Sequence, residues 1–397
     1  MRKILWVLGL FLFTLPVSAQ VLRAEAPAIV SNAAVVMDAA TGTIIYSKNP
    51  DMEIPPASLT KLMTMHLAFR EIYAGKASMN EIIEPTRESW AINQLPFSSL
   101  MLLAPGQKLS LRELLLGLAV FSGNDASAAV ALRFAPTIDA FVEMMNREAR
   151  SLGLTRTNFA DASGYSPYNM TTAREFAEFS RFYLKAHPQS LMEFHSVSEF
   201  AYPRPENVAA PFQEDPATRV QRNRNNLLGS VEGVDGLKTG SIPAAGFNIS
   251  LTAERSGTRF IAVILGAPSG WGGDRIRDED GRRLLEWAFS NFKTIRPHPD
   301  APEPVRVWKG RRNHVNIIWG APLEFTALIE RGEDLEWTIV IDNPLVAPFP
   351  VFSPVGNLIL YDSLGELRRI PLVTALEVER GGLFRRLFDS IRLFFKR

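Results

Sequence analysis

The residues Pro56-Ala57-Ser58-Leu59-Thr60-Lys61 stand where an extended segment gives way to a helical one. Pro55 and Pro56 stop the extended chain. Apolar residues then recur every three or four positions, which predicts a helix over Ser58–Arg70. Ser58 and Lys61 lie three positions apart and therefore share one face of this helix. A serine can be activated by a neutral lysine, and a helix start favours developing negative charge. The segment therefore has the geometry that a serine nucleophile at Ser58 with Lys61 as its base would need.

Two further polar motifs follow, and no single motif is specific. The Ser-x-x-Lys pattern recurs at Ser290–Lys293, and each motif taken alone is more typical of a helix cap or a solvated residue. Ser122-Gly123-Asn124 separates two apolar helical stretches, and Lys238-Thr239-Gly240 ends a β-rich run. The specific signal is the order: a helix start, a loop between helices and a strand. This order is the one described for penicillin-binding proteins and class A β-lactamases.

The remaining periodicity predicts an α+β domain. Two β-rich runs, Ala33–Asp38 and Thr43–Tyr46, flank Thr41-Gly42 and predict a hairpin. Strands at both ends with helices between them favour one domain whose terminal segments share a sheet. Helices are expected at Leu111–Phe121, Asp125–Phe134, Ile138–Leu152, Thr172–Leu184 and Arg282–Phe292, and strands at Val234–Thr239, Gly246–Ala253 and Arg259–Gly266.

A proline-rich segment divides the chain. Arg296–Pro304 contains four prolines in nine residues, which predicts a stiff linker over 296–304. We therefore expect a catalytic domain over 27–295. Short runs such as Trp337–Ile341 alternate with Pro and Gly further on, which predicts a small all-β domain over 305–376.

The two ends of the chain predict export and a membrane contact. Arg2 and Lys3 precede the apolar run Ile4–Pro16 and the small residues Val17-Ser18-Ala19, the layout of a secretory signal over 1–19. The apolar run is shorter than the roughly 20 residues that a membrane anchor needs. Over 379–397, Phe, Leu and Ile lie on one helical face and mostly basic residues on the other. This pattern favours a helix on a membrane surface over one docked on the protein's own core.

Composition excludes several other functions. The 397 residues carry a net charge of +1, so no electrostatic footprint for nucleic acid is present. The chain has no cysteine, which excludes disulfides, thiolate catalysis and zinc bound by cysteine. Its five histidines occur in no recognisable catalytic context, and no His-Glu-x-x-His motif supports a zinc protease.

The motifs and the stretches between them resemble those of one enzyme family. Pro56–Lys61, Ser122–Ala126 and Val234–Gly240 look like the three motif regions of the low-molecular-mass D-alanyl-D-alanine carboxypeptidases, of the penicillin-binding protein 5/6 type. Further stretches also match, namely Gly153–Phe159, Thr172–Arg174 and Asn223–Leu227. The resemblance covers nearly the whole mature chain. It implies a β-lactamase/transpeptidase-like domain, an antiparallel sheet flanked by helices, followed by the β domain and the amphipathic tail.

The resemblance also implies a role for each site residue. Ser58 would attack the carbonyl between two terminal D-alanines of a peptidoglycan stem peptide, with Lys61 as base. Ser122 and Asn124 would pass protons and hold the substrate amide. Lys238 and Thr239 would bind near the terminal carboxylate, and Gly240 leaves room for the substrate to lie against the strand edge. Arg277 resembles the arginine that contacts the terminal carboxylate, and the backbone N–H groups of Ser58 and Ser241 would form the oxyanion hole. β-Lactam antibiotics would acylate the same serine. No metal or organic cofactor is implied, and the enzyme would act on the periplasmic face of the cytoplasmic membrane.

Three alternatives remain at the level of sequence. A β-lactamase is disfavoured, because no Glu-x-x-Leu-Asn segment follows Ser122 and because the extra domain and tail are present. A D,D-endopeptidase of the same superfamily and a catalytically weak cell-wall scaffold protein stay open. Two departures bear on them: Ser241 stands where close relatives often have histidine, and Gln94–Leu103 differs from the usual pattern.

Overall fold

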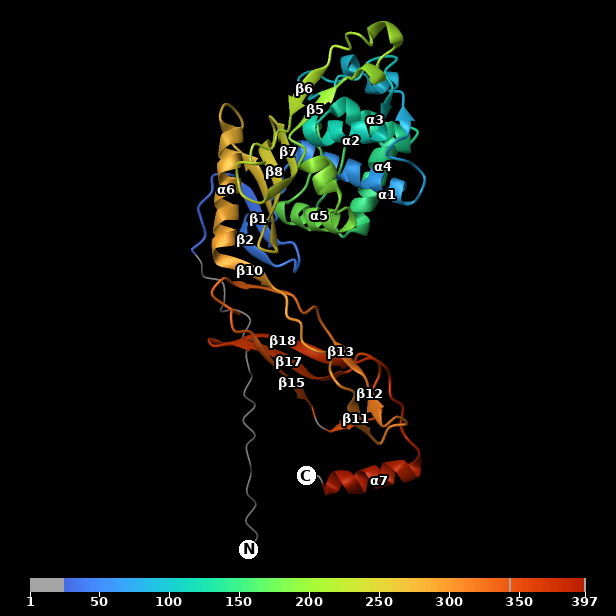
Figure 1. Cartoon of the computed structure of the whole chain (residues 1–397), viewed down its shortest axis with the longest axis vertical. Coiled ribbons are helices and arrows are strands. Elements are labelled where there is room, and N and C mark those ends of the chain that lie inside the picture. The colour runs from blue at the N-terminus through green and yellow to red at the C-terminus, as the bar shows by residue number, and fades with distance from the viewer. Residues whose placement is uncertain (1–24, 343, 396–397) are drawn as a thin grey trace.

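Both ends of the α+β region contribute strands to one five-stranded antiparallel sheet with the order β2-β1-β9-β8-β7 (Figure 1). The computed structural model describes residues 25–342 and 344–395, so the expected signal at 1–19 lies outside the described residues. β1 pairs with β2 on one side and with β9 on the other, which confirms the hairpin and the shared sheet. The strands are β1 (Ala33–Asp38), β2 (Ile44–Lys48), β7 (Val234–Ile242), β8 (Gly246–Arg255) and β9 (Thr258–Ala267).

The sheet is buried on both faces. In β1, Val35 packs into one hydrophobic cluster and Val36 into another, and Val263 and Ile264 of β9 divide in the same way. Neighbouring residues of a strand point to opposite faces, so the sheet separates two helical layers. One layer contains α1 (Lys61–Tyr73), α2 (Leu111–Leu116), α3 (Asn124–Phe134), α4 (Ile138–Ser151) and α5 (Ala173–Ala186); the other contains α6 (Gly273–Asn291).

The predicted start of the last of these helices was wrong. α6 begins at Gly273, well before the expected Arg282. Its first two turns are rich in charged residues, which hides them from an argument based on apolar spacing. Three of these charged residues, Arg277, Asp278 and Asp280, are buried. Arg277 lies at the candidate site, and the Asp280 carboxylate accepts a hydrogen bond of 2.8 Å from the Ser31 backbone N–H.

Two other helical predictions needed smaller corrections. Ser58 lies in a short 3-10 helix, η1 (Ala57–Thr60), and α1 begins only at Lys61. The apolar stretch Leu111–Phe121 is helical as predicted, but it changes from α2 to a π-helical turn, η4 (Gly117–Phe121). Both irregular turns lie beside the motifs, and π-helical turns are frequent at functional sites.

The β region is built from strands of 2 to 10 residues and extends away from the α+β region (Figure 1). Two of its sheets have the orders β12-β11-β16 and β13-β18-β17-β15. Its strands are β11 (Val305–Trp308), β12 (His314–Val315), β13 (Ile317–Trp319), β14 (Phe325–Leu328), β15 (Glu336–Ile341), β16 (Leu345–Val346), β17 (Pro354–Asp362) and β18 (Gly365–Thr374).

The two regions are joined by more than the proline-rich segment. β10 (Phe292–Ile295), which follows α6 directly, pairs antiparallel with β14. The buried Asp38 of β1 accepts hydrogen bonds of 2.8 Å from the hydroxyl groups of Thr294 and Thr326, which belong to β10 and β14. One carboxylate therefore ties the central sheet to the β region.

The tail forms the helix α7 (Leu383–Phe394) at the end of the β region that lies farthest from the α+β region (Figure 1). Its apolar side chains are exposed, with Phe384 and Phe394 each 77% exposed. Its polar face contacts the β region, because the buried Asp389 carboxylate accepts a hydrogen bond of 2.6 Å from the Lys309 backbone N–H. The helix is therefore docked through its polar face and not through an apolar one.

Candidate active site

Ser58 lies on a turn that is compressed between two other segments. The preceding residue, Ala57, has φ +52°, a conformation that L-residues rarely adopt and that clusters at functional sites. A Cβ atom on Gly164 would lie 1.8 Å from the Ala57 carbonyl oxygen, and one on Gly240 would lie 2.8 Å from the Ser58 nitrogen. Two glycines therefore allow the loop around Gly164 and the strand β7 to approach the serine from either side.

Lys61 is fully buried, and its amine reaches three partners. Lys61 Nζ lies 3.1 Å from Ser58 Oγ, 2.7 Å from Asn124 Oδ1 and 2.7 Å from the Ser163 carbonyl oxygen. Burial lowers the pKa of Lys61 to about 7, although the carboxylates of Asp161 and Asp125 oppose this shift. The amine can therefore lose its proton near neutral pH, as a base for the serine must.

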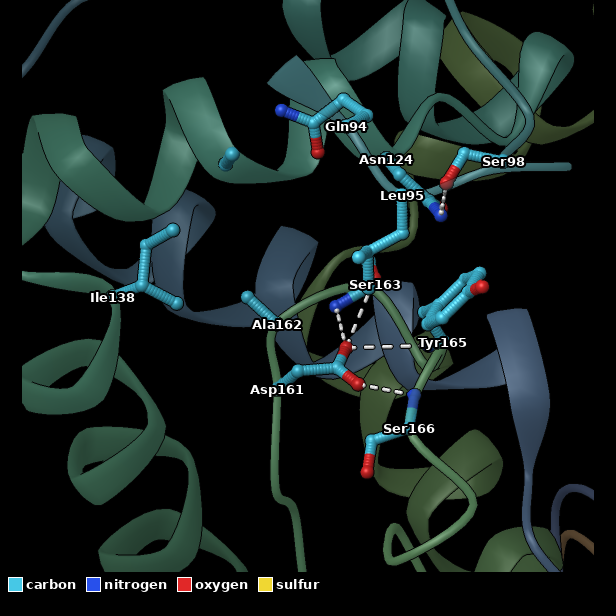
Figure 2. Close-up of a pocket in the computed structure, with 11 residues that line it drawn as sticks. Gln94, Leu95, Ser98, Asn124, Ile138, Asp161, Ala162, Ser163, Tyr165 and Ser166 are labelled. Carbon is cyan, nitrogen blue, oxygen red and sulfur yellow. Dashed lines mark hydrogen bonds between the residues drawn. The ribbon is translucent and has the colours of Figure 1, made fainter. Parts of the chain in front are cut away.

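The second motif is held by the irregular helix before it. Ser122 ends the π-helical turn in the left-handed conformation, with φ 59° and ψ 34°, and Asn124 begins α3. Asn124 Nδ2 donates a hydrogen bond of 3.2 Å to Ser98 Oγ (Figure 2). Because its Oδ1 atom contacts Lys61 at the same time, Asn124 links the lysine to the loop around Ser98.

The third motif forms one wall of a polar cavity of about 260 Å³. The predicted site residues that line this cavity are Ser58, Ser122, Thr239, Gly240, Ser241 and Arg277. The structure thus brings together residues from η1, η4, β7 and α6. Lys238 is buried behind this wall, and its Nζ atom donates a hydrogen bond of 2.9 Å to the Thr239 carbonyl.

Arg224 and Arg277 line the cavity, together with Asp274. Burial lowers the pKa of Lys238, and repulsion from Lys61, Arg224 and Arg277 adds to the effect. Arg277 is paired with the Asp278 carboxylate, at 2.9 Å from Nε and 2.6 Å from Nη2. Such a cluster suits an anionic group of a ligand, because arginine binds carboxylates through several donors. Within 25–342 and 344–395, no group of three or more His, Asp or Glu is placed to hold a metal ion.

Comparison with known proteins places the chain in a family. The family model described as D-alanyl-D-alanine carboxypeptidase matches residues 20–269. The D-alanyl-D-alanine carboxypeptidase DacC of Escherichia coli (strain K12) is 33% identical over 395 residues, which cover 97% of this chain and 94% of that protein. This chain belongs to the D-alanyl-D-alanine carboxypeptidase family.

The likeness to this carboxypeptidase family includes the β region. Penicillin binding protein 5 from Haemophilus influenzae gives a TM-score of 0.76 at 28% identity and covers 89% of this chain and 99% of its own. The expected transpeptidase-like α+β fold with a following β region is confirmed. A D-alanyl-D-alanine endopeptidase from Pseudomonas aeruginosa is 28% identical over 270 residues, which cover 68% of this chain and 80% of that protein. The endopeptidase alternative is thus represented by a more distant relative.

Two residues at the carboxypeptidase site, Arg224 and Asp125, were not predicted from the sequence. Arg224 lines the polar cavity and makes no hydrogen bond or ion pair with any residue in the described part of the chain. It lies in Asn223–Leu227, a stretch that matched the family without any residue being singled out. Asp125 directly follows the second motif. Its carboxylate accepts the backbone N–H groups of Met101, Leu102 and Leu103 at 2.7–3.0 Å, which shapes the divergent loop Gln94–Leu103.

Two other cavities adjoin the candidate active site. One, of about 410 Å³, runs past Ser58 between Tyr165 and the end of β7. The other, of about 270 Å³, lies on the far side of Asn124 and is walled by Leu95, Ile138 and the Asp161–Ser166 loop (Figure 2). The divergent loop contributes residues to both cavities.

Proposed function

We propose that this chain is a serine-type D-alanyl-D-alanine carboxypeptidase that removes the terminal D-alanine from peptidoglycan pentapeptide stems. The observation that carries the proposal is the 3.1 Å contact between Lys61 Nζ and Ser58 Oγ, with the lysine shielded from water. The names and functions of the family members support the substrate.

Acylation follows from the position of these two groups. Ser58 Oγ attacks the carbonyl carbon of the penultimate D-alanine, and its proton passes to the neutral Lys61 amine. The carbonyl oxygen becomes an oxyanion between the backbone N–H groups of Ser58 and Ser241. When the C–N bond breaks, the proton returns through Ser122 to the leaving amine, and Asn124 holds the substrate amide.

Deacylation completes the cycle. Water attacks the ester carbon on Ser58, the C–O bond breaks, and the serine regains its proton. Ser241 stands where close relatives often have histidine. Its contact with the oxyanion is made by the backbone N–H and does not depend on the side chain. The same serine would open a β-lactam ring, because the strained amide presents the same carbonyl to Ser58.

The polar cavity supports an exopeptidase. Thr239, Arg224 and Arg277 line it beside Ser58. A free terminal carboxylate next to the scissile bond fits these cations. This cavity favours the removal of a terminal residue over the cleavage of a cross-link.

Labelled penicillin tests the nucleophile. The mature protein should form a stable covalent adduct, and Ser58→Ala should abolish it. Ser290→Ala is a matched control, because Ser290 begins the second Ser-x-x-Lys pattern and lies exposed on α6. Wild-type protein without an adduct, or an undiminished adduct in Ser58→Ala, would refute the assignment.

Two substrates separate the proposed activity from its alternatives. A pentapeptide stem should release free D-alanine, and a cross-linked dimer should remain intact. Cleavage of the cross-link alone would favour the endopeptidase. Turnover of neither substrate, together with a normal penicillin adduct, would favour the scaffold.

We infer further that the enzyme is exported and binds the membrane surface through α7. Family members that act on peptidoglycan support export. The exposed apolar face of α7, next to Arg385, Arg386 and Arg392, supports an interfacial helix. None of the helices in the described part of the chain combines the length and apolar character needed to cross a membrane.

A further inference from the structure

The Asp161–Ser166 loop is organised around one carboxylate (Figure 2). Asp161 Oδ1 accepts the backbone N–H groups of Ser163 and Gly164 at 2.6 Å and that of Tyr165 at 3.3 Å. Asp161 Oδ2 accepts the Ser166 N–H at 2.6 Å and Asn169 Nδ2 at 3.0 Å. Both oxygens are occupied by donors of the loop and of Asn169, so Asp161 is not placed to bind a ligand directly.

The loop delivers a carbonyl group to the proposed base. The Ser163 carbonyl oxygen accepts a hydrogen bond of 2.7 Å from Lys61 Nζ, and Asp161 holds the N–H of the same residue. The neighbouring Ala162 carbonyl is fixed by the hydroxyl groups of Thr64 and Ser127 at 2.7 and 2.6 Å. The loop is thereby seated on α1 and α3, the helices that begin at Lys61 and Asn124.

Close packing leaves the Asp161–Ser166 loop little room to move against α1 and α3. Gly164 packs on the Ala57 carbonyl so closely that a Cβ atom would lie 1.8 Å away. A shift of the loop would therefore move both the Ser58 turn and the oxygen that orients the lysine amine. The dense hydrogen bonding of Asp161 resists such a shift.

Asp161 also bears a charge beside the amine. Burial alone would raise the pKa of Asp161, but hydrogen bonds from Ser166, Asn169 and Ser163 outweigh burial and keep this pKa below its ordinary value. The carboxylate is therefore ionised at neutral pH. The negative charges of Asp161 and Asp125 favour the protonated form of Lys61. Burial and the positive charge of Arg224 favour the neutral form. Lys238 and Lys61 also repel each other as cations.

We propose that Asp161 is a positioning residue for Lys61, which holds the Ser163 carbonyl on the lysine amine and places a fixed negative charge beside it. This inference rests on the proposed role of Lys61 as base. In the described part of the chain, Asp161 makes no hydrogen bond with Ser58, so its effect on the reaction passes through the lysine.

Acylation rates measured against pH test the two parts of the role separately. The full chain is reacted with saturating labelled penicillin over a range of pH values. Asp161→Asn keeps the size of the side chain but removes its charge. We expect the acidic limb of the profile to move down by about one pH unit. We also expect the plateau rate to fall on the order of tenfold, because an asparagine side chain has one acceptor oxygen where aspartate has two. Part of the hydrogen bonding that positions the loop would then be lost.

A second variant isolates positioning from charge. Asn169 is neutral and buried, and it donates to Asp161 Oδ2 and to the Ser166 carbonyl oxygen. Asn169→Ala should lower the plateau rate while leaving the acidic limb in place, since no charge is lost. Asp139→Asn is the matched charge control. It removes an exposed carboxylate from the first turn of α4 and should leave the profile unchanged.

The outcomes distinguish this inference from the proposed function. An unlabelled wild type, or labelling that survives Ser58→Ala, would refute the nucleophile itself. Ser58-dependent labelling with a wild-type profile in Asp161→Asn would overturn only the role of Asp161. A lower rate in Asp161→Asn without movement of the limb would also overturn it, because loop shape alone explains that result. Thermal unfolding of each variant shows whether it is folded.

Discussion

Lys61 combines complete burial with three hydrogen-bond partners, and this combination should make acylation depend on pH. Burial lowers the pKa of Lys61 to about 7, and only the neutral amine can accept the serine proton. The neutral fraction should rise from about a tenth at pH 6 to about nine tenths at pH 8. The acylation rate with saturating labelled penicillin should follow the same curve. A rate that is flat or falls over this range would show that Lys61 is not the base.

At the scale of single residues, the sequence identified the groups that carry recognisable patterns. Ser58, Lys61 and Asn124 meet through the amine of Lys61, as the order of the motifs predicted. Arg224 and Asp161 were not identified, because neither belongs to a sequence motif with a characteristic spacing. Their positions depend on how loops far apart in the sequence fold around Lys61 and the polar cavity.

At the scale of elements, Gly164 allows two segments to meet at the serine. Gly164→Ala should disrupt the Ser58 turn, because φ is +83° and a Cβ atom would lie 1.8 Å from the Ala57 carbonyl oxygen. We expect penicillin labelling to slow on the order of 100-fold, as it would for a displaced nucleophile.

Gly153→Ala is the matched control for backbone strain alone. Gly153 has φ +78°, and no atom lies within 4 Å of a Cβ built on it. This variant should lose roughly 1–2 kcal/mol of stability from the left-handed conformation and should keep its labelling rate. Equal labelling rates in the two variants would show that the close approach at Gly164 is unimportant.

Elements with apolar periodicity were predicted well, and those that serve the site were predicted less well. α4 and α5 were predicted to within one or two residues at each end. The start of α6 was missed because its buried residues there include Arg277 and Asp280. The 3-10 turn at Ser58 was missed because it depends on contacts with β7 and the Gly164 loop. Local spacing carries no information on such contacts.

At the scale of the whole molecule, Asp38 fastens the α+β region to the β region. Its carboxylate accepts the Thr294 and Thr326 hydroxyl groups at 2.8 Å and the Ala40 backbone N–H at 2.9 Å. Asp38→Ala removes the acceptor of all three donors, of which, among the described residues, only Thr326 keeps another partner, the Thr41 hydroxyl at 2.8 Å. The change should cost about 2–3 kcal/mol of stability. Thermal unfolding should begin earlier, and proteolysis near Arg296–Pro304 should be faster. Asp300→Ala, an exposed residue of that segment, is the control. Unaltered proteolysis in Asp38→Ala would contradict a fastening role.

The position of α7, at the far end of the β region, would set the distance between the catalytic site and the membrane (Figure 1). Phe384 and Phe388 are 77% and 62% exposed, while Asp389 on the other face accepts the Lys309 N–H. Replacing both phenylalanines by serine keeps the docked polar face but removes roughly 1.5–3 kcal/mol of burial in lipid for each side chain. Binding to phosphatidylglycerol-containing vesicles should weaken by at least about tenfold. Truncation after Glu379 should abolish it.

Two controls test whether vesicle binding depends on α7 rather than on any exposed apolar side chain, and whether it depends on charge. Phe212→Ser removes an aromatic ring that is 63% exposed on the α+β region and should not change vesicle binding. Added salt should weaken wild-type binding, because the basic residues of the tail contribute about 1 kcal/mol each near an anionic surface. If the double serine variant bound vesicles as tightly as the wild type, the apolar face of α7 would have to meet something other than lipid. The helix would then be a docking surface for another protein, and the reach of Ser58 toward peptidoglycan would be set by that partner.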